Sequence, residues 1–201
     1  KNFNKNKVIA VEPCGNLAKI TKANKFKTYN SFWSKKLAKK IIKIDKKIDL
    51  IYSANTISHI PNLIEVFGAV SIAMSNNGVF VFEDPYIGSV IKINSYDQFY
   101  DEHVHLFSLL SMFKILSKTD MKIFDVETIN THGGSIRFYI CKKNSNFKKS
   151  INIKKIKKRE MKQKLHKFST YVKFSQRVKK SKKDLLKLLS KLKEKNKKII
   201  S

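Results

Sequence analysis

The chain has 201 residues, of which 42% are hydrophobic, and this is enough for one domain with a real core and an appendage. No stretch approaches the roughly 20 uncharged apolar residues that a bilayer-crossing helix needs, which excludes a protein held in a membrane in that way. The chain begins at Lys1 and shows no signal peptide, so we expect a cytoplasmic protein whose beginning is missing. Cys14 and Cys141 are too few and too far apart for a zinc site, and we expect two reduced thiols.

The net charge of +28 is concentrated in the C-terminal part of the chain. Residues 143–201 contain 23 Lys or Arg and 3 acidic residues, whereas the rest contains 20 and 12. Lys greatly outnumbers Arg, and Asn and Ile are abundant, which is the mixture that an AT-rich genome encodes. We therefore attribute most of the charge to coding bias, and a selected anion-binding surface stays open as the alternative.

Short apolar strands alternate with helices in the first half of the chain. Strands are expected at 7–11, 26–29, 48–53 and 79–82. Helices are expected at 15–23, at 34–43 with Ser34 as N-cap, and at 61–74, with a turn at 76–78. This alternation predicts a parallel α/β sheet, in which ligands bind beyond the carboxyl ends of the strands. Three polar sites follow those ends: Glu12, Ala54 with Asn55, and Glu83 with Asp84.

The pattern changes after residue 95. A helix is expected at 106–117, and two strands at 121–129 and 135–141 are joined by a glycine-bearing loop into a hairpin. From 151 to 196 the chain has the pattern of one long helix or two. Its apolar residues recur at spacings of three and four, and they are Met161, Leu165, Phe168, Val172, Leu185, Leu189 and Leu192. We expect a helix packed on its own domain or on a missing one, with membrane-surface or nucleic-acid binding as alternatives.

Two short segments carry candidate ligand contacts. Glu12 directly follows a strand, where a carboxylate can accept two hydrogen bonds from ribose hydroxyls, although a surface glutamate is the plainer interpretation. The glycine-rich loop that usually precedes such a glutamate is absent from the sequence. Asn55 and His59 are four residues apart, so both can face one side of a helical turn, although a lone histidine is more often structural or solvated.

The densest polar cluster lies at 96–105, with two phenols, three carboxylates and two imidazoles. Histidine has an unperturbed pKa of about 6.5, which suits proton removal near neutral pH. A neighbouring carboxylate can orient the ring, and a phenol can donate to a developing oxyanion. The cluster therefore indicates acid–base chemistry, while a plain polar loop and a metal site stay open as alternatives.

Several segments together resemble one family, the C-methyltransferases that act on nucleotide-linked 4-keto-deoxysugars. The family patterns F-D-T-I-Y-H-E-H, N-N-V-F-A-H-V, G-V-E-P, G-V-F-V-F-E and H-G-G-S-L-R are similar to residues 96–103, 54–60, 10–13, 78–83 and 132–137. Their order and approximate spacing agree from about residue 8 to 142. One departure is Asp101, which replaces the first histidine of Y-H-E-H and bears on the substrate preference.

The resemblance implies a fold and a domain organisation. The fold is a class I methyltransferase, Rossmann-like α/β sheet that ends in an antiparallel strand pair and lacks its first strand. Residues 1–145 then form the methyltransferase domain, without the glycine-rich cofactor loop. Residues 146–201 form a basic helical connector to a C-terminal domain that the chain lacks. Members of the family also carry an N-terminal zinc module, which the chain does not include.

The resemblance also assigns the chemistry of deoxysugar biosynthesis to named residues. His103 is the expected base that removes a proton beside the ketone, and the resulting enolate takes the methyl group of S-adenosylmethionine. Tyr100 and His59 would stabilise the enolate oxygen. Glu102 would hold the His103 ring and favour its charged form. No metal is expected.

Binding roles follow from the same resemblance. Glu12 would hold the ribose of S-adenosylmethionine, Phe32 with Trp33 would form a wall for adenine, and Ala54 and Asn55 would line the methionine end. The substrate is expected at the segment that contains His132, Gly133, Ser135 and Arg137, where Arg137 would pair with a phosphate. The expected partner is a nucleotide-linked sugar, with no membrane and no nucleic acid. The alternatives are a class I methyltransferase with another small acceptor and a non-catalytic basic module that binds nucleic acid.

Overall fold

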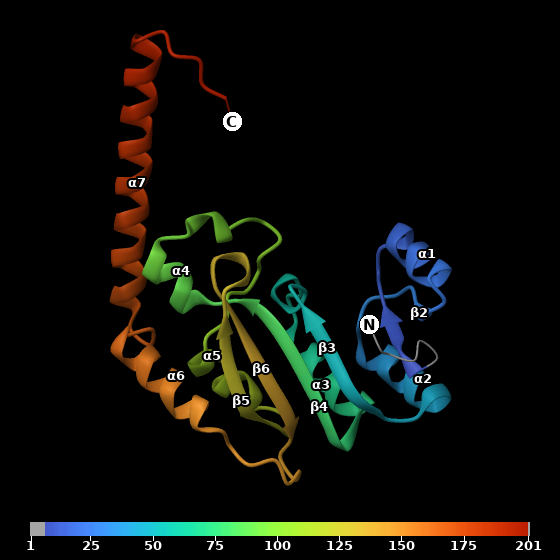
Figure 1. Cartoon of the computed structure of the whole chain (residues 1–201). Coiled ribbons are helices and arrows are strands. Elements are labelled where there is room, and N and C mark those ends of the chain that lie inside the picture. Colours follow the sequence, from blue (N-terminus) through green and yellow to red (C-terminus); the bar gives the residue numbers. More distant parts are fainter. Residues whose placement is uncertain (1–6, 201) are drawn as a thin grey trace.

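The N-terminal part of the chain forms two short parallel strands in the computed structural model, which describes residues 7–200 (Figure 1). β1 (Ile9–Val11) pairs with β2 (Lys27–Tyr29), and α1 (Gly15–Ala23) connects them. Both strands and the helix lie where the apolar pattern predicts them, so this strand–helix–strand unit is confirmed.

Two capped helices attach this unit to the rest of the domain. α2 (Lys35–Asp45) begins after Ser34, whose side chain accepts a hydrogen bond from the first turn. α3 (Leu63–Ala73) begins after Asn62, which caps it in the same way. Both helices were predicted, and Ser34 is confirmed as an N-cap. The helices pack together through small side chains, namely Ala38, Ala69 and Ala73.

The larger sheet has four strands in the order β3-β4-β6-β5. β3 (Ile48–Ala54) is parallel to β4 (Met74–Pro85), with α3 between them in sequence. β6 (Ser135–Lys142) runs antiparallel to β4 on one side and to β5 (Met121–Ile129) on the other. The predicted α/β architecture with a C-terminal antiparallel pair is therefore confirmed.

The sheet is divided, however, because no strand pairing joins β1 to β3 among residues 7–200. Figure 1 shows β1, β2 and α1 standing apart from β3. Each of the two strands keeps one unpaired edge, and on β3 the side chains of Leu50 and Tyr52 are 54% and 60% exposed. An unpaired edge of this kind can accept a further strand. The missing first strand of the sheet stays a prediction.

β4 differs from the sequence-based expectation at its start. The predicted turn at 76–78 is instead part of a strand that begins at Met74. The pairing with β3 shifts from Ile48–Met74 to Leu50–Val79, so the Asn-Asn-Gly segment bulges out of the ladder. Gly78 fits here because a Cβ would lie 2.9 Å from the carbonyl oxygen of Ile48.

The segment between β4 and β5 holds two helices. α4 (Ile87–Ile93) was not predicted, because its seven residues are rich in β-branched side chains that favour strands. α5 (Leu109–Leu116) was predicted and is shorter than expected, since a capping box between Ser108 and Ser111 fixes its start. The predicted hairpin of β5 and β6 is confirmed, and a short 3₁₀ turn at Thr131–Gly133 closes it.

Aromatic side chains form the centre of the core beneath the four-stranded sheet. Phe82 stacks on Phe138 with ring centroids 5.0 Å apart, and it meets Phe107 edge-on at 5.4 Å. All three side chains are at most 1% exposed. Because these residues come from β4, β6 and the segment just before α5, this contact joins the sheet to the helical layer.

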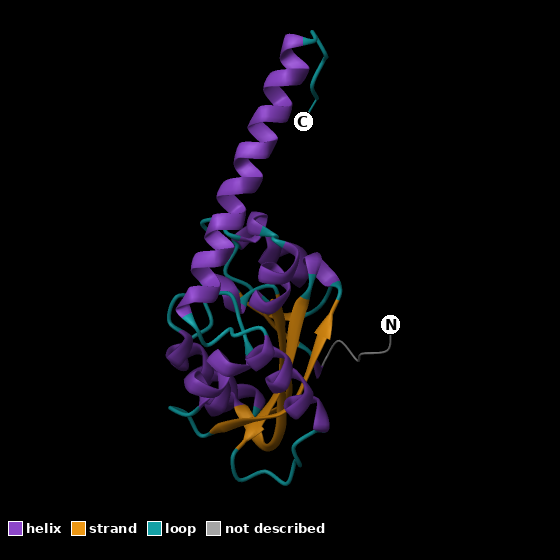
Figure 2. Ribbon diagram, turned by 90° about the vertical axis from the view of Figure 1, so that its left-hand side faces the viewer, coloured by secondary structure: helices purple, strands orange, loops and turns teal. Residues whose placement is uncertain are grey.

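Two helices follow the hairpin. The sequence predicted either one long helix or two in this region, and the second alternative is confirmed. α6 (Ile151–Lys162) lies on the domain, where Ile153 and Ile156 join the main core. α7 (Phe168–Glu194) extends far beyond the sheet, as Figure 2 shows. Among residues 7–200, no helix is long and apolar enough to cross a membrane.

Only the first part of α7 is covered by the domain. Phe174 is buried, and Tyr171 and Val178 pack beside it in a cluster that includes α4. Met161 and Phe168, which were predicted on the packed face, are 45% and 81% exposed. Leu165 is buried as predicted, but Val172 is also exposed, because α4, which was not predicted, packs against Phe174 instead. Leucines of the second half stay exposed, namely Leu185, Leu186 and Leu188.

Candidate active site

The polar cluster at 96–105 holds the ring of His103 by two hydrogen bonds. Tyr100 Oη lies 2.8 Å from Nε2, and the carbonyl oxygen of Gln98 lies 2.9 Å from Nδ1. A carbonyl can only accept, so Nδ1 carries the proton and Nε2 accepts from the Tyr100 hydroxyl. The local fold therefore presents Nε2 as the basic nitrogen of His103. Sequence reasoning missed Gln98, because its contribution comes from the backbone.

His59 reaches the same place from the loop after β3. Its ring centroid lies 5.1 Å from that of His103, in an edge-on arrangement. Glu102 was expected to hold His103, but its carboxylate lies 3.9 Å from Nδ1 of His59 and is 74% exposed. That role is corrected: Gln98 and Tyr100 orient His103, and Glu102 lies beside His59. The predicted set of His59, Tyr100, Glu102 and His103 is nevertheless brought together.

His105 links the two loops that carry the histidines. Its backbone N–H donates to the carbonyl of Ser58 at 3.0 Å, and the ring Nε2 donates to the carbonyl of Pro61 at 3.1 Å. The two segments are more than 40 residues apart in sequence, so no local pattern could reveal this contact. His105 is thus a positioning residue, and its presence in the polar cluster was the only available signal.

Asp84 holds the loop that carries His59 through hydrogen bonds to Ser58. It is fully buried at the end of β4, and its Oδ1 accepts hydrogen bonds from the N–H and the hydroxyl of Ser58, at 3.1 and 2.5 Å. Its Oδ2 is buried without a hydrogen bond. Burial raises the pKa of Asp84 to about 6, while hydrogen bonds from Ser58 and the charge of His103 act in the opposite direction.

Asp84 should make stability depend on pH. Its pKa in the native state, about 6, lies above the ordinary value of 3.8, so the native state binds more protons in that window. Stability from this group therefore falls as pH rises from 3.8 to about 6, and it is constant above. We expect Asp84→Asn to gain stability relative to the wild type across this window, by up to about 3 kcal/mol.

Urea unfolding of both proteins at several pH values between 4 and 7 measures this difference. Asp184→Asn on the exposed part of α7 is the matched control and should track the wild type. A constant difference between Asp84→Asn and the wild type over the whole range would contradict the assignment.

The residues expected to bind the cofactor lie at the carboxyl ends of β1 and β3. Glu12 accepts a hydrogen bond from the Cys14 N–H through Oε1 at 2.8 Å. Asn55 has a left-handed backbone, with φ of 48°, and its N–H donates to the Glu83 carbonyl. Ala54 precedes it at the end of β3. The two strand ends belong to separate sheets, so the structure does not join them through a strand ladder.

These groups fit S-adenosylmethionine in part. Among residues 7–200, the second carboxylate oxygen of Glu12 makes no hydrogen bond, which leaves it able to accept from a ribose hydroxyl. Phe32 and Trp33 do not pack together to form the expected wall for adenine. Phe32 is 78% exposed, whereas Trp33 packs against the core and donates from its indole to the Val66 carbonyl.

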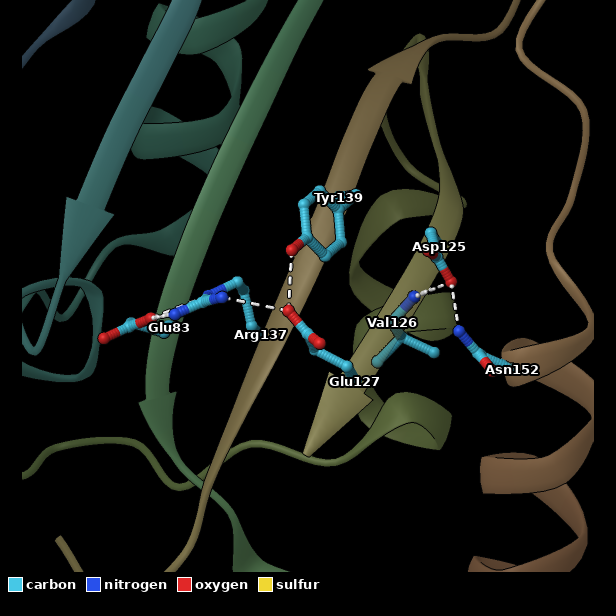
Figure 3. Close-up of polar contacts among 7 residues, drawn as sticks. All are labelled: Glu83, Asp125, Val126, Glu127, Arg137, Tyr139 and Asn152. Atoms are coloured by element: carbon cyan, nitrogen blue, oxygen red, sulfur yellow. Dashed lines mark hydrogen bonds and ion pairs between the residues drawn. The ribbon is translucent and has the colours of Figure 1, made fainter. Parts of the chain in front are cut away.

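Arg137 does not lie free for a phosphate, contrary to the prediction. Its guanidinium is paired with Glu83 at 2.6 Å and with Glu127 at 2.9 Å, and Tyr139 also donates to Glu127 (Figure 3). The strand register places Glu83 and Glu127 directly opposite Arg137 on its two sides. The Arg137 side chain therefore forms ion pairs with both neighbouring strands and is not available as a substrate ligand.

The remaining residues of the predicted substrate segment shape the hairpin loop. His132, Gly133 and Gly134 have consecutive positive φ values of 50°, 76° and 117°. Ser135 is fully buried, and its hydroxyl donates to the Thr131 carbonyl, so it does not face a ligand. Glycine is needed at Gly134, because a Cβ there would lie 2.5 Å from the Ser89 hydroxyl.

Comparison with known proteins places this chain in a family. Residues 1–126 match the family model described as a methyltransferase domain, and residues 130–201 match the C-methyltransferase C-terminal domain. The first match covers more than half of the chain, so the chain belongs to the methyltransferase domain family. The predicted methyltransferase family is therefore confirmed.

The chain is also similar to one curated C-methyltransferase. The chain is 30% identical over 130 residues to C-methyltransferase NovU of Streptomyces niveus. The match covers 65% of this chain and 31% of the relative, so the chain spans about a third of the length of the curated relative it matches. The resemblance to the C-methyltransferases that the motifs indicated is thus confirmed.

Solved structures with similar folds are more distant in sequence. An S-adenosylmethionine-dependent methyltransferase from Clostridium acetobutylicum ATCC 824 has a TM-score of 0.49 and 15% identity, over 66% of this chain and 74% of that one. An S-adenosylmethionine-dependent methyltransferase from Anabaena variabilis ATCC 29413 has a TM-score of 0.49 and 15% identity, over 68% of each chain.

Proposed function

We propose that this chain is the methyltransferase part of a C-methyltransferase that acts on a nucleotide-linked 4-keto-deoxysugar through an enolate. The observation that carries the proposal is the environment of His103. Gln98 fixes the proton on Nδ1, so Nε2 can accept a proton beside the phenol of Tyr100 and the ring of His59. A base and two potential oxyanion donors at one point suit proton removal next to a ketone.

Each side chain has one task in the proposed reaction. Nε2 of His103 removes the proton from the carbon beside the ketone, and the electron pair of that C–H bond forms the enolate. Tyr100 releases Nε2 and donates its hydroxyl to the enolate oxygen, and His59 donates from the other side. The Gln98 carbonyl, which accepts from Nδ1, stabilises the charged imidazole after transfer. When bound, S-adenosylmethionine supplies the electrophilic methyl group.

The organisation of the chain enters the same proposal. Residues 1–145 would be the methyltransferase domain and 146–201 the connector toward a further domain, in a cytoplasmic enzyme of deoxysugar biosynthesis. Glu12 and Asn55 would hold S-adenosylmethionine at the ends of β1 and β3. Because the sequence has no glycine-rich cofactor loop, we expect the chain alone to bind S-adenosylmethionine weakly in calorimetry.

The position of the transferred methyl group tests the proposal. The protein is incubated with a large excess of S-adenosylmethionine carrying a ¹³C-methyl group, so that weak cofactor binding does not prevent the reaction. Three acceptors are compared: a nucleotide-linked 4-keto-deoxysugar, a simple ketone and a hydroxyl acceptor. We expect a new methyl signal on the carbon next to the ketone of the nucleotide-linked sugar. A methyl group bound to oxygen, or preference for another acceptor, would reject this substrate class.

A further inference from the structure

A pocket of about 400 Å³ lies where α4, the hairpin loop and α6 meet. This volume is within the usual range of small-ligand sites. Its walls carry two cations, Lys92 from α4 and Arg159 from α6, and its lining includes no carboxylate. The polar residues Ser89, Thr128 and Asn130 also line it. This combination of groups suits an anionic ligand.

The two cations differ from Arg137 in their partners. Among residues 7–200, neither Lys92 nor Arg159 forms an ion pair, whereas Arg137 is bound to two carboxylates. The guanidinium of Arg159 lies over the Tyr86 ring, 5.3 Å from its centroid, which restricts its position without neutralising its charge. The carboxylate of the neighbouring Glu160 accepts from the first backbone N–H groups of α5. Burial raises the pKa of this carboxyl, and the charge of Arg159 acts to lower it.

The pocket adjoins the loop that carries the candidate base. Gly133, which lines the pocket, lies next to Ser95. A Cβ added to Gly133 would be 3.6 Å from the Ser95 hydroxyl oxygen. Ser95 directly precedes the turn that begins the polar cluster. A ligand whose anionic part occupies the pocket can therefore extend along this loop toward His103.

We propose that this pocket binds the diphosphate of a nucleotide-linked substrate, with Lys92 and Arg159 as the phosphate ligands. The inference rests on the proposed function, and it assigns to these two residues the role that was predicted for Arg137. Arg159 can bind two phosphate oxygens with its planar guanidinium, and Lys92 supplies a point charge from α4.

Calorimetric titration with inorganic pyrophosphate tests the pocket directly on the whole chain. We expect saturable binding, and the double variant Lys92→Ala/Arg159→Ala should weaken it at least about tenfold, because hydrogen bonds to charged groups are strong. The matched control is Lys187→Ala/Lys191→Ala, which removes the same charge from the exposed half of α7. Equal weakening in both double variants, or no saturable binding by the wild type, would overturn the proposal.

Further measurements separate this inference from the proposed function. Far-UV circular dichroism and the Tm verify that each variant is folded. In the proton-exchange assay described below, the pocket variant should raise KM for a nucleotide-linked ketosugar while it leaves kcat unchanged. If the Lys92→Ala/Arg159→Ala variant exchanges protons with an unaltered KM, the pocket is not the diphosphate site, while the proposed function is unaffected. Pocket-specific pyrophosphate binding without any exchange would reject the proposed substrate and leave the anion site.

Discussion

Replacing His103 with alanine is expected to slow strongly the exchange between solvent deuterium and the proton on the carbon beside the ketone of a nucleotide-linked 4-keto-deoxysugar. The wild-type ring has its proton fixed on Nδ1 by the Gln98 carbonyl, so Nε2 is the nitrogen that takes the substrate proton. General acid–base groups typically contribute 10²- to 10⁴-fold, and we expect a loss of about that size. Exchange requires the base and the sugar but no methyl donor, so weak cofactor binding does not obscure it.

The control for this variant is His166→Ala, which removes an exposed imidazole from the turn between α6 and α7. It should exchange at the wild-type rate. Tyr100→Phe, which removes the hydroxyl bonded to Nε2, should reduce exchange because the enolate oxygen loses a donor. Undiminished exchange by His103→Ala would remove His103 from the mechanism.

Replacing Phe82 with alanine is expected to cost about 3–5 kcal/mol in the free energy of unfolding, the usual range for a buried phenylalanine. Phe82 is fully buried and contacts Phe138 and Phe107, so its removal leaves a cavity between the sheet and the helical layer. Urea denaturation followed by circular dichroism measures the loss.

The matched control is Phe32→Ala, since the Phe32 side chain is 78% exposed. Its effect should stay within about 0.5 kcal/mol, as for most surface substitutions. Equal losses in the two variants would mean that the aromatic cluster does not form the centre of the core.

The sequence predicted those elements whose signals are local. Ser34 marks the start of α2 by its side-chain hydrogen bond, and the apolar alternation of β5 and β6 with glycines between them gives the hairpin. α4 was missed because β-branched residues in a seven-residue segment favour a strand, whereas in the fold this segment is a helix that packs against α7.

The candidate site was predicted as a set of residues, while several of their contacts were not. His59 and His103 come together through His105 and Ser58, in segments far apart along the chain. Asp84 was named as a polar group at a strand end, but its support of Ser58 required the fold. Such contacts depend on three-dimensional packing, for which a single sequence carries no local signal.

The roles of charged groups were the least predictable part. Arg137 was expected to face a phosphate, but the register of β4, β6 and β5 sets Glu83 and Glu127 on both sides of it. A shift of one residue in that register would reverse which face each side chain occupies. Glu102 was likewise expected at His103 and lies instead beside His59. Charge partners therefore follow from tertiary register more than from motif.

The role of His103 as the base is tested by proton NMR of the unaltered protein with a nucleotide-linked 4-keto-deoxysugar in deuterated buffer. We expect one proton signal, from a carbon next to the ketone, to disappear in the presence of the protein and to persist with His103→Ala. Loss of no signal, or equal loss with both proteins, would contradict the assignment of His103 as the base.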